Sequence, residues 1–200
     1  LGLPRRPGAW ILRGMRTPSI EPRRRHLGNG LTALAVHRPY AVTAVVHVDV
    51  RVGSRFEGTR EGGLSHFLEH MVFRGCDGYP SPTAVDEAAE RIGAALDANT
   101  GRDSTRYQHI VDPSHLADSL ALVARLLSTP LFLGIDNERE VIIEESLDEV
   151  DDRGNLIGAE ALSRALVWPE SALGRRIIGD PRDLRRLTVD DLRRHHGRFY

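Results

Sequence analysis

The chain has 200 residues, 40% of them hydrophobic and 28% charged, and a formal net charge of −1. That length suits one globular domain with a sizeable core, and the composition is that of a folded chain, not a disordered or fibrous one. The near-zero charge predicts no bulk attraction to nucleic acid or anionic lipid, and the apolar runs are shorter than the ~20 residues of a membrane span. Cys76 is the single cysteine, so no internal disulfide can form, and we take the cytoplasm as the default compartment.

The N-terminal quarter is predicted to hold a lead-in followed by two strands. Leu1–Met15 is mildly apolar, but its apolar run is too short for the core of a signal sequence. We therefore expect residues 1–28 to be a flexible lead-in, with the arginine run Arg23–Arg25 on a solvated face, and residues 29–200 to form the domain. Leu31–His37 and Thr43–Val52 are rich in β-branched residues and predict two adjacent strands, the second with one polar face.

Two helices and a second pair of strands follow. A Gly-Gly pair precedes a predicted helix over Leu64–Phe73. Ser81, followed by proline, is a good N-cap for another helix, which Gly93 ends. Ala94–Thr100 and Thr105–Val111 then predict strands on either side of a tight turn.

The rest of the chain is predicted to be helical. Asp112 caps one helix, and a longer helical region begins near Asp136 and breaks around Asp152–Asn155. Helix resumes over Ala159–Val167, and Thr188 caps a last helix. The predicted strands come first, and helices interleaved with a second pair of strands follow them. This order predicts an α+β fold in which helices pack on one face of a largely antiparallel sheet.

The segment from His66 to His70 reads H-F-L-E-H, an H-x-x-E-H pattern. On a helix, His66 and His70 lie one above the other and can hold one ion, and Glu69 lies on nearly the same side. Imidazole suits Zn²⁺, which at catalytic sites takes three protein ligands and leaves a position open. A carboxylate beside the metal can accept a proton from water. In the alternative interpretation, both histidines are ordinary helix side chains.

A second acidic helix, Asn137–Ser146, follows at a distance that would allow it to supply a third ligand. By itself this segment is equally well explained as a plain amphipathic helix with a solvated acidic face. The two segments together therefore predict a metal site better than either does alone.

The residues in these segments resemble a known family. Gly62–Gly75 resembles the signature H-F-L-E-H-M-x-F-x-G of the insulinase/pitrilysin (M16) family of zinc metallopeptidases, which includes the mitochondrial processing peptidases. Ile92–Thr100 resembles the family's next strand, and Glu138–Glu145 its E-R-x-V-I-x-x-E helix. The resemblance implies a metalloenzyme LuxS/M16 peptidase-like fold, with residues 29–200 as a catalytic domain that stops before its last strands.

That resemblance also implies a set of site residues. One Zn²⁺ would be held by His66, His70 and Glu145, and Glu69 would activate the zinc-bound water. Glu138 would orient one of the zinc-binding histidines.

Two positions leave alternatives open. Glu144 is the rival third ligand, but Glu138 and Glu145 lie two helical turns apart and share a face, whereas Glu144 is turned about 100° away. On the strand after the motif, relatives often carry Asn-Ala-(aromatic)-Thr, and this chain has Asp97 in place of the asparagine. The family binds substrate along that strand as an added β-strand, so Asp97 could favour a basic group on the substrate.

By this resemblance the chain is a zinc-dependent endopeptidase that hydrolyses peptides or unfolded polypeptide segments. The family's active enzymes also need a homologous second-half domain in cis or a partner subunit in trans, so the isolated 200 residues are expected to be weakly active or inactive. The alternatives are a non-catalytic structural subunit and an unrelated metal-binding module. Structural subunits usually lose zinc-site residues, and their retention here favours the enzyme.

Overall fold

The computed structural model describes residues 21–200, which fall into two compact units, residues 21–41 and residues 42–200. The first 20 residues of the predicted lead-in therefore lie outside the described part. In the first unit, β1 (Arg23–His26) and β2 (Thr32–Ala35) form an antiparallel hairpin with Arg23 opposite Ala35. The arginine run is thus part of a strand, although its side chains are exposed as expected.

The sequence predicted that the two strands after the lead-in are adjacent, and the pairing of β2 shows that this prediction is wrong. β2 pairs with β1, and the strand that follows β2 in the sequence belongs to another sheet. The reason is local: Gly30 adopts a φ of 88°, and its N–H donates to the Leu27 carbonyl at 3.0 Å, which closes a tight turn. A turn this short favours pairing with the preceding segment.

The second unit is built on a three-stranded antiparallel sheet in the order β3-β5-β4. Its strands are β3 (Ala44–Val50), β4 (Ala95–Thr100) and β5 (Thr105–Val111). β5 lies in the middle, and β4 is an edge strand of this sheet among the described residues. The α+β architecture predicted from the sequence is confirmed.

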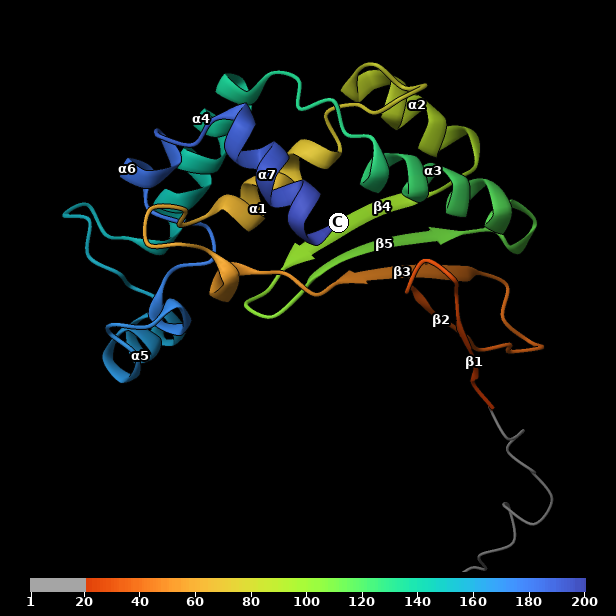
Figure 1. The fold of residues 1–200 in the computed structure, drawn as a ribbon, viewed down its shortest axis with the longest axis horizontal. Helices are drawn as coiled ribbons and strands as arrows, with labels where there is room; N and C mark the ends of the chain where they lie inside the picture. The colour runs from red at the N-terminus through yellow and green to blue at the C-terminus, as the bar shows by residue number, and fades with distance from the viewer. Residues whose placement is uncertain (1–20) are drawn as a thin grey trace, which may run out of the picture. The chain divides into compact units, whose positions relative to one another are not determined.

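Helices cover one face of this sheet in Figure 1. The α-helices in residues 21–200 are α1 (Leu64–Val72), α2 (Pro82–Arg91), α3 (Leu116–Ser128), α4 (Ile135–Ser146), α5 (Ala159–Val167), α6 (Pro181–Leu184) and α7 (Val189–Phe199). α3 contacts β3 and β5, while α1 and α2 contact β4. Short 3-10 turns, Ser54–Phe56, Pro113–His115, Leu147–Glu149 and Ala172–Gly174, join these elements.

α1 lies at the centre of the helical layer, in contact with α4, α7 and β4. Phe67, Leu68 and Met71 are fully buried on it and pack in one cluster with Ile142 of α4 and Leu192 of α7. Burying side chains of this size contributes about 1.5–3 kcal/mol each relative to exposure. The predicted metal-binding helix is therefore a rigid core element.

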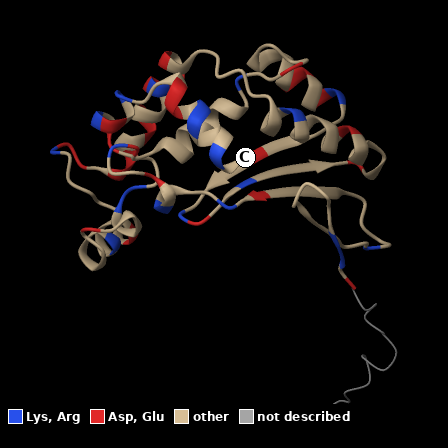
Figure 2. Cartoon of the chain, viewed as in Figure 1, with Lys and Arg blue, Asp and Glu red and all other residues tan. Residues whose placement is uncertain are grey.

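Most helix boundaries agree with the caps predicted from the sequence. The Ser81 hydroxyl accepts a hydrogen bond from the Ala84 N–H at the start of α2, and Thr188 forms a capping box with Asp191 at the start of α7. The short α6, which begins at Pro181 after its cap Asp180, was not predicted. Figure 2 shows acidic and basic residues interspersed along the helices. Within residues 21–200, the helices lack the combination of length and hydropathy that a membrane span requires.

Candidate metal centre

The three side chains predicted as metal ligands converge. His66 and His70 on α1 and Glu145 on α4 each offer one ligand atom, and these atoms all lie within 4.8 Å of one another. His66 Nε2 is 3.9 Å from Glu145 Oε1, and His70 Nε2 is 3.6 Å from Glu145 Oε2. Ligands bonded at about 2 Å to one tetrahedral Zn²⁺ lie roughly 3.3 Å apart, so a small closure of this group would fit the ion.

The electrostatics of His66 also suit a metal. Burial, followed by the nearby His70, lowers the pKa of His66 to about 4. The imidazole is therefore neutral over the physiological range, and a neutral ring is the form that binds a metal ion. Two imidazole nitrogens and one carboxylate are the donor set typical of a catalytic zinc site.

Glu138 on α4 has the contact expected of a group that orients a zinc histidine. His70 Nδ1 donates to Glu138 Oε1 at 2.9 Å, which leaves the Nε2 lone pair pointing towards Glu145. The other carboxylate oxygen, Oε2, is 3.3 Å from Arg74 NH1. Such a carboxylate fixes both the tautomer and the orientation of the ring. Arg74 was not predicted, although it follows His70 by four residues.

Glu69 is 8% exposed and lies beside the three converging side chains. The hydroxyl of Thr100, the last residue of β4, donates to Glu69 Oε2. Burial raises the pKa of Glu69, while the Thr100 hydrogen bond and then His70 act in the opposite direction. A carboxyl close to the metal ligands is placed to accept a proton and to return it.

The α4 helix distinguishes the two neighbouring glutamates by direction. Glu145 belongs to the group of converging ligand atoms, and Glu144, one position away, does not. Glu138 also faces α1, two turns before Glu145. The predicted common face of Glu138 and Glu145 is therefore present, and Glu144 lies exposed on another side of the helix.

Sequence reasoning missed Glu57, which holds the N-terminus of α1. Its carboxylate is 5% exposed and accepts from Gly63 N at 3.0 Å and from Ser65 N at 2.7 Å. Gly63, the N-cap of α1, adopts a φ of 88°, and a Cβ there would lie 2.5 Å from the Ile178 carbonyl oxygen. Because Gly63 has no side chain with which to cap the helix, the carboxylate does so from six residues upstream. Burial raises the pKa of Glu57 to about 7.

Asp97 is turned away from this site. Along β4, Leu96, Ala98 and Thr100 are partly or fully buried, while Ala95, Asp97 and Asn99 are exposed. Successive residues of a strand alternate between faces, so Asp97 lies on the face opposite Thr100 and Glu69. Its side chain is thus exposed on the other face of the sheet and does not lie beside the metal ligands.

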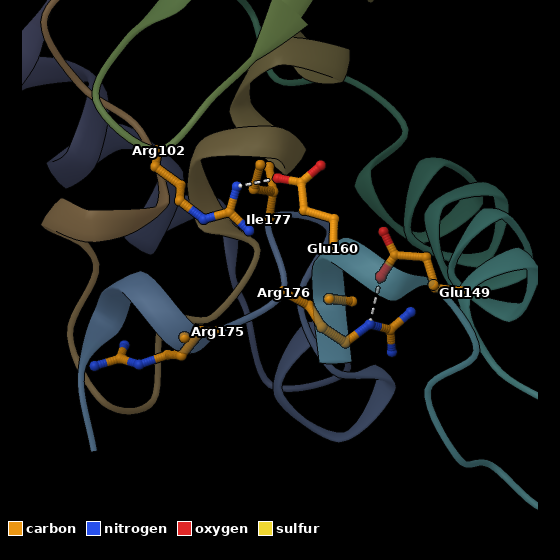
Figure 3. Close-up of a pocket in the computed structure, with 9 residues that line it drawn as sticks. Arg102, Glu149, Glu160, Arg175, Arg176 and Ile177 are labelled. Carbon is orange, nitrogen blue, oxygen red and sulfur yellow. Dashed lines mark hydrogen bonds and ion pairs between the residues drawn. The ribbon is translucent and has the colours of Figure 1, made fainter. Parts of the chain in front are cut away.

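A pocket lined by charged side chains lies in the same unit. It has a volume of about 210 Å³ and lies near the β4–β5 turn and α5, and Figure 3 shows the side chains that line it. In it, Arg102 NH1 lies 3.3 Å from Glu160 Oε1, and Arg176 Nε lies 2.7 Å from Glu149 Oε2. None of the residues assigned to the metal centre lines this pocket.

The sequence and the fold both match known proteins. A family model described as insulinase (peptidase family M16) matches residues 32–180. The chain is 35% identical over 168 residues to a protein named "Probable mitochondrial-processing peptidase subunit beta" from Schizosaccharomyces pombe, covering 83% of this chain and 36% of that protein. It is 32% identical over 166 residues to an uncharacterised zinc protease of Rickettsia felis, covering 82% of this chain and 40% of that protein.

Among solved structures, the chain is similar to the first half of the periplasmic protease PqqL from Escherichia coli. The TM-score is 0.78 and the identity 26%, over 90% of this chain and 40% of that one. The chain therefore spans about two fifths or less of the length of these relatives.

Proposed function

The chain belongs to the insulinase family of peptidases (M16), and we propose that it carries the catalytic centre of a zinc-dependent endopeptidase. The family itself is one of metallopeptidases, and several of its members similar to this chain are named as zinc proteases. The observation that carries the finer proposal is the convergence of His66, His70 and Glu145, with the buried Glu69 alongside.

In this proposal each residue of the centre has one role. His66, His70 and Glu145 hold one Zn²⁺, which when bound polarises the substrate carbonyl and makes water more acidic. Glu69 accepts a proton from the attacking water and returns it to the amine that leaves when the peptide bond breaks. Glu138 holds His70 in the orientation and tautomer needed for binding.

The proposed substrate is a peptide or an unfolded polypeptide segment. β4 supports this choice because, as an edge strand of its sheet among the described residues, it has backbone N–H and C=O groups free for an added strand. Its last residue, Thr100, contacts Glu69, so a strand bound along β4 would pass close to the proposed base. Main-chain pairing of this kind tolerates many side chains.

We further propose that activity needs a homologous second half, on the same chain or on a partner subunit. The support is the short coverage of the relatives, one of which is named as a subunit, together with the similarity to one half of a protease. In this proposal the second half encloses the substrate and supplies groups that stabilise the transition state. The 200 residues alone would then be weakly active or inactive.

The test is Glu69→Gln in the complete protein, meaning this chain together with its second half. Because the amide cannot accept the proton, the variant should keep its zinc and lose turnover of a quenched, unstructured peptide by at least about 10²-fold. Glu144→Gln, an exposed carboxylate on α4, is the matched control and should behave as the parent does. Turnover by Glu69→Gln at the parental rate would move the base elsewhere. A zinc-loaded complete protein without turnover would favour the non-catalytic subunit.

A further inference from the structure

The hydroxyl of Thr100 occupies an unusual place for a strand residue. Thr100 ends β4, is 6% exposed, and donates its hydroxyl hydrogen to Oε2 of Glu69, 31 positions earlier in the chain. A buried hydroxyl needs a partner, and here the partner is the carboxylate proposed as the catalytic base. We infer that Thr100 is a positioning residue for Glu69, an inference that rests on the proposed function.

The contact makes the two oxygens of Glu69 unequal. Oε2 already accepts from the Thr100 hydroxyl, which leaves Oε1 as the less engaged oxygen for accepting a proton from water. A glutamate side chain has three rotatable bonds, and without a partner its carboxyl would sample several orientations. A misplacement of about 1 Å in a reacting group can cost about 10²-fold in rate.

Thr100 is itself held firmly. It lies directly opposite the fully buried Thr105 in the antiparallel pairing of β4 with β5. The next residue, Gly101, donates its N–H to the Ser104 carbonyl at 2.8 Å, which closes the turn between β4 and β5. Because threonine is β-branched, its χ1 torsion is stiff, and the hydroxyl direction follows from the backbone.

This arrangement ties the base to the proposed substrate strand. A peptide added along β4 takes its register from the backbone of that strand, and the Thr100 side chain on the same strand fixes Glu69. The same rigid strand, β4, therefore positions both the scissile bond and the proton acceptor. Removing the hydroxyl should therefore slow the chemical step and leave the binding of substrate and zinc almost unchanged.

The experiment compares Thr100→Val and Thr100→Ser in the complete protein. Valine keeps the shape and removes the hydroxyl, so kcat should fall about 10–100-fold while KM and the zinc dissociation constant stay within about twofold of the parent. Serine retains the donor and should restore most of kcat. A crystal structure of the metal-free Thr100→Val protein should show the Glu69 carboxyl rotated or in more than one orientation.

Thr105→Val is the matched control, because it also removes a buried hydroxyl from this sheet but one that bonds to the Val52 carbonyl. It should lose stability and keep kcat. Should Thr100→Val fail to fold, Thr100→Ala carries the same expectation. A kcat for Thr100→Val within twofold of the parent, or an equal loss in Thr105→Val, would overturn the inference. If Glu69→Gln is also fully active, the proposed role of Glu69 as the base fails; if Glu69→Gln is inactive while Thr100→Val is unaffected, only the role of Thr100 fails.

Discussion

Replacing Glu57 by glutamine should change how the stability of the protein depends on pH. The buried carboxyl has its pKa raised from 4.5 to about 7, chiefly by desolvation. Between these two values the unfolded chain loses the proton while the folded chain keeps it, so stability falls as pH rises through this range. Above pH 7 both states are ionised and the loss is complete. The difference between the two pKa values corresponds to about 3 kcal/mol.

The glutamine variant lacks this titration but keeps a side chain of the same shape. Between about pH 4.5 and pH 8, the free energy of unfolding of Glu57→Gln minus that of the parent should therefore rise by about 3 kcal/mol. This rise does not depend on which of the two proteins is the more stable at the acid end of that range. Urea unfolding of the metal-free proteins at several pH values measures this, and all other titrating groups cancel in the difference. Glu144→Gln, an exposed carboxylate, should show no such trend. A constant difference between parent and Glu57→Gln across this range would refute the reasoning.

Three further predictions concern the metal centre and its context. Glu138→Gln should weaken zinc binding about 10–100-fold in a chelator competition, because His70 loses its carboxylate partner; an unchanged affinity would contradict that role. His66→Ala and Glu145→Gln should each lower the zinc content measured by atomic absorption, and full stoichiometry in both would disprove the ligand assignment. The isolated chain should hydrolyse a quenched peptide at least about 10²-fold more slowly than the complete protein; equal rates would show that no second half is needed.

Features that depend on residues close together in the sequence could be predicted before the fold was known. The α1 helix could be predicted over almost its observed range, and with it the common face of His66, Glu69 and His70, because helical periodicity relates residues three and four apart. The α+β class followed from the order of the elements. The family followed from the segment around the motif and from the helix Glu138–Glu145, and the comparisons confirm it.

Other features depend on contacts between residues distant in the sequence, and these contacts exist only in the folded chain. The packing of α4 on α1 brings Glu145 close to the two histidines. From the sequence, this closeness was expected only because of the family resemblance. Glu57 was missed because the N-terminus of α1 is capped from an upstream turn, where no local cap signal exists. The contact of Thr100 with Glu69 depends on which face of β4 the helices cover, since strand alternation defines two faces without saying which is buried. The spacing of residues along the chain determines which side chains share a face of a helix or strand. The packing of the helices on the sheet determines which other residues that face contacts.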